Sequence, residues 1–254
     1  ILLLAAVVSA CLWGIYQWWR GYPSSSTHAL IGGPVGASVG SAILGHQPLY
    51  GINSTLLTLV ILPLVISPVL AYVLSYLAVP PTVWAARNTT PGQVNRRTRQ
   101  LQSVAGAAVA FGHGLQDGQR TIVILLFALI AAGTVNDGDL PLWVPLFTAA
   151  FITLGTLLGG WRISYTLGQR LVRVDPIRGF VAQSIAAGLL FIGAIAFALP
   201  LSTTHTVTAA IAGAGQNQRF AVTNGRILTR IITAWVATPI AAAALGALFY
   251  LALS

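Results

Sequence analysis

The sequence contains no lysine, glutamate or methionine, and it has one cysteine and four acidic residues, all of them aspartate. The single cysteine, Cys11, excludes an internal disulfide framework and a cysteine-based metal site. Charged residues make up 7% of the chain, whereas soluble domains contain about 25%. Because Ile1 lies inside an apolar run and no methionine is present, we expect a fragment or a processed chain that lacks its original N-terminus.

Apolar residues dominate what is present: they make up 56% of the chain, and the mean hydropathy is +0.81. This composition predicts a multi-pass integral protein of the cell membrane, embedded in the lipid bilayer. All 13 basic residues are arginine and the net charge is +9, a balance also found in nucleic-acid-binding proteins. We exclude that class because the arginines lie in short segments between apolar runs, where they orient a membrane protein.

Apolar runs of about 20 residues indicate membrane-spanning helices. Such runs lie at residues 1–19, 49–79, 101–135, 140–160, 180–199 and 231–253. The arginine-rich segments 80–102, 161–179 and 216–230 are predicted to be cytoplasmic, and the acidic loop 136–139 is predicted to lie outside. The expected divisions are the C-terminal part of a first repeat (1–79), a cytoplasmic linker loop (80–102) and a second repeat (103–254).

A hydroxyl-rich motif occurs twice, each time after an apolar run. The first signature is Pro23-Ser24-Ser25-Ser26-Thr27-His28, and the second is Pro200-Leu201-Ser202-Thr203-Thr204-His205-Thr206. Their histidines are 177 residues apart (205 − 28), and at the same offset Gly36 falls opposite Gly213. With the arginine-rich segments inside, the spans before the two signatures run in opposite directions. We therefore predict an all-α, inverted-topology repeat secondary transporter with broken or re-entrant helices at the signatures.

Serine and threonine are good N-terminal caps, so each signature is expected to open a half-helix. A helix N-terminus offers free backbone N–H groups and partial positive charge, which suit an anion. Two such ends with hydroxyls around them suit a tetrahedral oxyanion such as phosphate or sulfate. The alternative is that these hydroxyls only cap and pack helices. The candidate substrate ligands are Ser25, Ser26, Thr27, Ser202, Thr203, Thr204 and Thr206.

The remaining candidates are ionisable groups. His28 and His205 could brace the signatures, bind the anion or carry a proton. Asp117 is the one acid expected inside the membrane, where it could bind Na⁺, carry a proton or pair with Arg120. His113 lies four residues before Asp117, so the two share a helix face. This pair lacks the further ligands that a metal site needs.

The two signatures, together with Phe111-Gly112-His113-Gly114-Leu115-Gln116-Asp117-Gly118-Gln119-Arg120, resemble the inorganic phosphate transporter (PiT) family over nearly the whole chain. The resemblance implies symport of inorganic phosphate with H⁺ or Na⁺, no other cofactor, and a homodimer as one arrangement of the chain. It also implies that Asp117, Gln116 and His113 serve ion coupling beside the signature hydroxyls. The family usually has asparagine where this chain has Gln116, and the matching element of the first repeat would precede Ile1.

Three alternatives remain open at this point. Sulfate fits the same donors, so a sulfate permease of the same fold is the nearest one. A non-transporting membrane scaffold or channel is the second. An intramembrane hydrolase that uses Ser202 or Ser25 is the third, but serine–histidine spacings repeated in two inverted halves suit a transport path better than a single active site.

Overall fold

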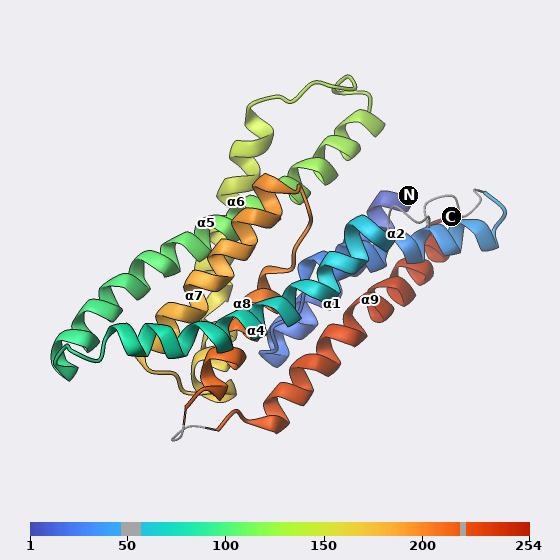
Figure 1. Ribbon diagram of the computed structural model, residues 1–254. Helices are drawn as coiled ribbons and strands as arrows, with labels where there is room; N and C mark the ends of the chain where they lie inside the picture. The colour runs from blue at the N-terminus through green and yellow to red at the C-terminus, as the bar shows by residue number, and fades with distance from the viewer. Residues whose placement is uncertain (47–56, 219–221) are drawn as a thin grey trace.

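The computed structural model describes residues 1–46, 57–218 and 222–254, and every regular element within these residues is helical (Figure 1). Within the described ranges, six helical stretches are long and apolar enough to cross a membrane, which confirms the predicted multi-pass, all-α fold. They are Leu2–Arg20, Thr58–Ala85, Pro91–Ala131, Trp143–Leu171, Pro176–Ala196 and Gly225–Leu253. The helices that follow the two signatures are not among them.

The individual elements, in chain order, are α1 (Leu2–Arg20), α2 (Ser26–Ile43), the π-helical turn η1 (Leu57–Ile61), α4 (Leu62–Ala85), α5 (Pro91–Ala131), α6 (Trp143–Tyr165), the π-helical η2 (Thr166–Leu171), α7 (Pro176–Phe191), the π-helical η3 (Ile192–Ala196), α8 (Thr203–Gln216) and α9 (Gly225–Leu253). The predicted span 49–79 lies partly outside the described residues.

The prediction of a loop over residues 80–102 was wrong. Helix α4 continues to Ala85 and α5 already starts at Pro91, so only residues 86–90 connect them. Proline fits the first turn of a helix because its missing N–H would have no partner there. The arginines and glutamines that follow are polar but good helix formers, so polarity alone misidentified this segment. Residues 161–171 are also helical, although their polarity suggested a loop. The side of the membrane on which these segments lie stays a prediction.

Two sets of three helices form matching contacts. Helix α2 packs on α1 and α9, and α8 packs on α7 and α4, while α1 also contacts α9 and α7 contacts α4. The set of helix–helix contacts stays the same when α1 is exchanged with α7, α2 with α8 and α4 with α9. The equivalent helices α1 and α7 run in opposite directions in Figure 1, as do α4 and α9. The last helix of each half therefore packs against the signature helix of the other half.

The glycine correspondence noted in the sequence has a packing role. A Cβ atom at Gly36 in α2 would overlap the backbone carbonyl of Ala243 in α9, and a Cβ atom at Gly213 in α8 would overlap the backbone carbonyl of Tyr72 in α4. Both crossings thus bring two helix backbones into direct contact, as small residues allow in membrane proteins. The α2–α9 and α8–α4 interfaces are equivalent in this respect.

The chain reverses at equivalent positions too. Gly21 follows α1 with φ of 71°, and Ala198, 177 residues later, follows η3 with φ of 50°. Ala198 is the one described non-glycine residue with positive φ. A left-handed conformation costs an L-residue roughly 1–2 kcal/mol, so the second repeat carries strain that glycine relieves in the first.

Ala198→Gly should therefore stabilise the folded protein by about 0.5–1 kcal/mol, after allowing for the greater freedom of glycine in the unfolded chain. The measurement is the thermal unfolding midpoint in detergent. Ala196→Gly is the matched control, because Ala196 is also exposed but has a helical conformation. That control should destabilise the protein by a similar amount. Equal shifts of the same sign in both variants would contradict strain at Ala198.

Candidate functional site

Both signatures begin a helix in the way that the sequence predicted. Ser25 caps α2, and its side-chain oxygen accepts a hydrogen bond from the backbone N–H of His28 at 3.2 Å. Ser202 caps α8 and accepts from the backbone N–H of His205 at 3.3 Å. Both serines are buried at 1% exposure. The remaining N–H groups of each first turn have no partner within their helix, so they are available to an anion.

Helix α8 starts well inside the bundle. Its C-terminal end lies beside the start of α7, since Nε of Arg178 donates to the carbonyl of Asn217 at 2.8 Å. The stretch Pro176–Ala196, which comprises α7 and η3, has 21 residues but α8 has only 14, so α8 begins about 10 Å short of the end of η3. Residues 197–202 cover the difference as non-helical chain. This second signature is thus a broken crossing, as predicted.

The two helix starts contact each other although they come from different halves. The hydroxyl of Thr204 donates to the carbonyl of Ser24 at 3.1 Å. The rings of His28 and His205 stack with centroids 4.6 Å apart, and Trp235 covers His205 at 3.9 Å. This stack has the geometry of the predicted bracing role. The described residues offer no hydrogen-bond partner to Nδ1 of His28 or Nε2 of His205, and the proton-carrying role stays a prediction.

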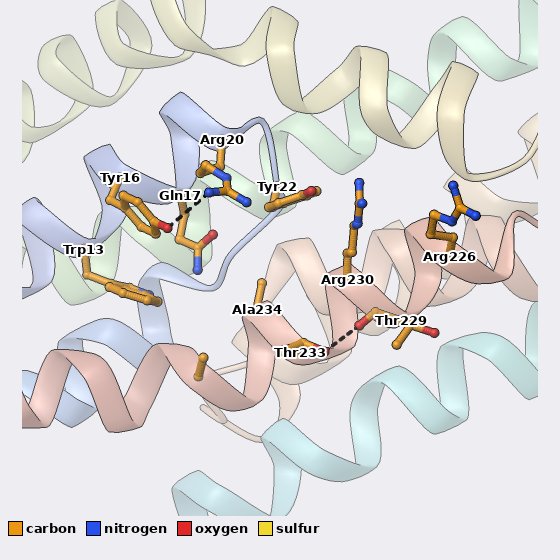
Figure 2. Close-up of a pocket in the computed structure, with 11 residues that line it drawn as sticks. Trp13, Tyr16, Gln17, Arg20, Tyr22, Arg226, Thr229, Arg230, Thr233 and Ala234 are labelled. Atoms are coloured by element: carbon orange, nitrogen blue, oxygen red, sulfur yellow. Dashed lines mark hydrogen bonds between the residues drawn. The ribbon is translucent and has the colours of Figure 1, made fainter.

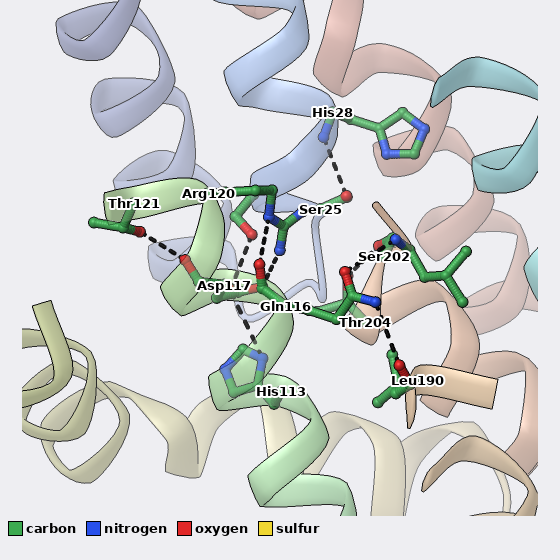
Figure 3. Close-up of polar contacts among 12 residues, drawn as sticks. Ser25, His28, His113, Gln116, Asp117, Arg120, Thr121, Leu190, Ser202 and Thr204 are labelled. Atoms are coloured by element: carbon green, nitrogen blue, oxygen red, sulfur yellow. Dashed lines mark hydrogen bonds and ion pairs between the residues drawn. The ribbon is translucent and has the colours of Figure 1, made fainter. Parts of the chain in front are cut away.

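Helix α5 brings the acidic residue to this junction. Asp117 forms an ion pair with Arg120, accepts a hydrogen bond from the hydroxyl of Ser26 at 3.2 Å, and lies 3.7 Å from Nδ1 of His113 (Figure 3). The serine belongs to the first repeat and the other three residues to the second. The carboxylate therefore links the two halves, and its side chain is 19% exposed.

Gln116 holds the chain that leads into the second signature. Its amide nitrogen donates to the carbonyls of Leu190 at 3.4 Å and Leu199 at 3.3 Å, and its amide oxygen accepts from the backbone N–H of Leu201 at 3.2 Å. The residue is 2% exposed. These three bonds fix where α8 starts relative to α5. Its predicted ion-coupling role stays a prediction beside this positioning role.

Arg120 is the site residue that sequence reasoning undervalued, because it entered only as a partner for Asp117. Its Nε donates to the carbonyl of Gln116 at 3.0 Å, while its Nη1 is buried without a hydrogen-bond partner among the described residues. A charged side chain in an apolar helix, three residues from the one intramembrane acid, was the signal that could have identified it. A buried guanidinium N–H without a partner is a donor ready for an anion.

A cavity of about 370 Å³ opens beside this guanidinium. Thr27 lines it with a hydroxyl that is buried and unpartnered in the described structure, and Leu199 and Pro200 line it from the second repeat. A water molecule occupies about 30 Å³, so the space holds an oxyanion with part of its hydration shell. The cavity lies toward the end of the bundle where η3 finishes.

A second cavity, also of about 370 Å³, lies on the other side of the α2 start. Ser25, Ser26 and Thr204 line it, and Trp18 from the end of α1 also contributes. Leu30 borders both cavities. The signature hydroxyls are thus divided between two spaces that point toward opposite ends of the bundle.

Three candidate hydroxyls, those of Ser202, Thr203 and Thr206, line neither of these cavities. Ser202 is the buried cap of α8. Thr206 is fully buried in α8, Thr203 is half-buried at its start, and neither side-chain oxygen has a hydrogen-bond partner among the described residues. No group of three or more histidine, cysteine, aspartate or glutamate side chains in the described ranges could hold a metal ion. Gly36-Ala37-Ser38-Val39-Gly40 matches the Gly-x-Ser-x-Gly string of hydrolases, but it lies within α2 rather than at a strand-to-helix turn.

Broken helices from two inverted halves that meet inside a helical bundle define a secondary transporter. The sequence model of the phosphate transporter family matches residues 1–93 and 82–246. The chain belongs to the phosphate transporter family, and it is therefore a multi-pass integral protein of the cell membrane.

Individual relatives agree with this assignment. The chain is 38% identical to a "Probable low-affinity inorganic phosphate transporter" of Rhizobium meliloti over 98% of this chain and 73% of that protein. It is 32% identical to a protein of the same description from Bacillus subtilis over 100% of this chain and 75% of that protein. A solved structure titled "The sodium-dependent phosphate transporter" superposes with a TM-score of 0.81 at 21% identity, covering 99% of this chain and 79% of that one. These proteins are described as transporters, not enzymes.

Proposed function

We propose that this protein carries inorganic phosphate across the cell membrane by symport with a cation, H⁺ or Na⁺. The observation that carries the proposal is the meeting of two capped helix starts beside a buried guanidinium N–H that has no partner in the described part of the chain. Phosphate would accept from Arg120, from the hydroxyl of Thr27 and from the free N–H groups of the helix starts. The names of the relatives agree with this substrate.

The two cavities suit alternating access. One leads to the signatures from the end where η3 finishes and the other from the end where α1 finishes. The hydrogen bond from Ser26 to Asp117 and the side chain of Leu30 lie between them. Rocking of one half against the other would open each cavity in turn to the same site, which is how inverted repeats work in secondary transporters.

The ion pair gives a physical basis for coupling. Phosphate and Asp117 would compete for the guanidinium of Arg120, since both are anions that it can bind. When phosphate binds, the carboxylate loses part of its counter-charge inside the membrane, where an unpaired charge is costly. A proton or Na⁺ would then neutralise it, with His113 as the nearest further group. Anion and cation would therefore bind together.

The test uses the protein reconstituted in liposomes with a labelled phosphate substrate. We expect uptake driven by an inward H⁺ gradient or by an inward Na⁺ gradient, and the gradient that works identifies the ion. An excess of unlabelled sulfate should leave uptake unchanged. Uptake that sulfate blocks would favour a sulfate permease, and no uptake under either gradient would favour a scaffold or channel. Homodimer formation also stays a prediction, which the mass of the reconstituted protein would test.

A further inference from the structure

A second cationic groove lies between the end of α1 and the start of α9 (Figure 2), and Tyr22, next to the first signature, lines both this groove and the second cavity. Its volume is about 620 Å³. Three arginines line it: Arg20 from α1, and Arg226 and Arg230 from α9. Hydroxyl, amide and aromatic side chains complete the lining, among them Tyr16, Gln17, Tyr22, Thr229 and Thr233.

The positive charge of this groove is not neutralised by the protein. In the described part of the chain, the ion pairs involve only Asp117 and Asp175, and neither acid lines the groove. Arg226 and Arg230 also lie in the first two turns of α9, which has no acidic residue in its first turn. Because the N-terminus of a helix carries partial positive charge, cations there are unfavourable. An anion in the groove would supply the missing counter-charge.

Gln17 is an independent sign of a polar ligand. It is buried at 5% exposure, and its amide forms no hydrogen bond to the described part of the chain. Figure 2 shows the amide pointing into the groove beside Arg20. The amide therefore has a donor and an acceptor that are free for a ligand in the groove, because the side chain is held there without a partner in the described residues.

Neighbouring aromatic residues place the groove at the membrane surface. Trp18 and Trp19 at the end of α1 are exposed, as is Trp161 near the end of α6. The two ends are joined, since the indole of Trp18 donates to the carbonyl of Gly159 at 2.9 Å. Exposed tryptophans gather at the level of lipid headgroups. A groove between two spanning helices at this level, rich in arginine, suits a phosphate group that a lipid carries.

We propose that the groove formed by Arg20, Arg226 and Arg230 binds the phosphate group of an anionic phospholipid. The arginines and the amide of Gln17 hold the headgroup, and exposed apolar side chains of α1 and α9 face the acyl chains. None of the three arginines lines either cavity at the signatures, and the proposal does not depend on which anion is transported.

The test is native mass spectrometry of the delipidated protein titrated with phosphatidylglycerol and, separately, with phosphatidylcholine. We expect preferential binding of phosphatidylglycerol. The variant Arg226→Gln/Arg230→Gln should weaken this binding about 30-fold and leave phosphatidylcholine binding unchanged. The matched control is Arg97→Gln/Arg99→Gln, which removes the same charge from exposed positions of α5 and should change neither affinity.

A third arm separates a lipid from a free ion. A large excess of inorganic phosphate should not displace phosphatidylglycerol from the unmodified protein. Displacement by inorganic phosphate, lost in the Arg226→Gln/Arg230→Gln variant, would show a site for the free ion and overturn the lipid assignment. Equal binding of phosphatidylglycerol to this variant and to the control would overturn the site itself.

Discussion

Arg120→Gln is expected to lower phosphate uptake by at least about tenfold. The guanidinium is the one charged donor beside the cavity of about 370 Å³ that Thr27 also lines, and its Nη1 has no partner in the described residues. A hydrogen bond to a charged group contributes about 1.5–3 kcal/mol, so losing one lowers the initial uptake rate at low substrate roughly 10- to 150-fold. The measurement is labelled phosphate uptake into liposomes that contain equal amounts of folded protein.

A second variant separates transport from folding. Arg120→Gln leaves Asp117 as an unpaired charge; breaking a fully buried ion pair in this way costs about 3–5 kcal/mol, and this partly buried pair should cost less. The double variant Asp117→Asn/Arg120→Gln removes both charges, so we expect its unfolding midpoint to recover while uptake stays as low as in the single variant. Arg99→Gln, exposed on the same helix, is the control and should transport normally. Normal uptake by the double variant would exclude both residues from the transport mechanism.

Gly36→Ala is expected to prevent stable assembly of the bundle. The added Cβ atom would overlap the carbonyl oxygen of Ala243, which is backbone and cannot rotate away. Helices α2 and α9 would have to separate, and overpacking of this kind costs about 3 kcal/mol at the upper end of its usual range. The measurement is the yield of monodisperse protein in size-exclusion chromatography, together with the unfolding midpoint.

The repeat provides a second variant with the same expectation. Gly213→Ala would overlap the carbonyl of Tyr72 across the equivalent α8–α4 crossing, so its loss of folded protein should match that of Gly36→Ala. Gly188→Ala in α7 is the control, because no atom lies within 4 Å of the added Cβ. There the better helix propensity of alanine should stabilise the protein by about 0.5–1 kcal/mol. A folded, stable Gly36→Ala variant would show that the two backbones do not touch.

Much of the fold could be predicted because a membrane-spanning helix can be recognised from its own local sequence. Length and apolarity of each run sufficed for the spans, and the signature serines identified the helix starts, since capping depends on the residue at one position. The arginine-rich segment 80–102 was mispredicted because polarity does not distinguish a loop from a polar helix end. The strain at Ala198 was also beyond the sequence, since alanine gives no sign of a left-handed backbone.

The residues of the candidate site were easier to predict from the sequence than their arrangement in space. Doubling of the hydroxyl motif singled out the signature residues, and the rarity of intramembrane charge singled out Asp117. Which polar atoms are already used by the protein depends on distances across the bundle: Gln116 is engaged three times, Thr204 once across the repeats, and Thr27 not at all in the described structure. These hydrogen bonds join residues that are up to 180 positions apart in the sequence.

The sequence by itself therefore determined that this chain is a membrane protein with two inverted copies of a hydroxyl-rich helix start, because composition, periodicity and capping are local properties. Only the tertiary structure decided that the two starts meet, that Arg120 keeps beside them a donor without a partner among the described residues, and that Arg20 joins Arg226 and Arg230 in one groove. The physical reason is that such proximity depends on how distant helices pack, and here that packing relies on close backbone contact at Gly36 and Gly213.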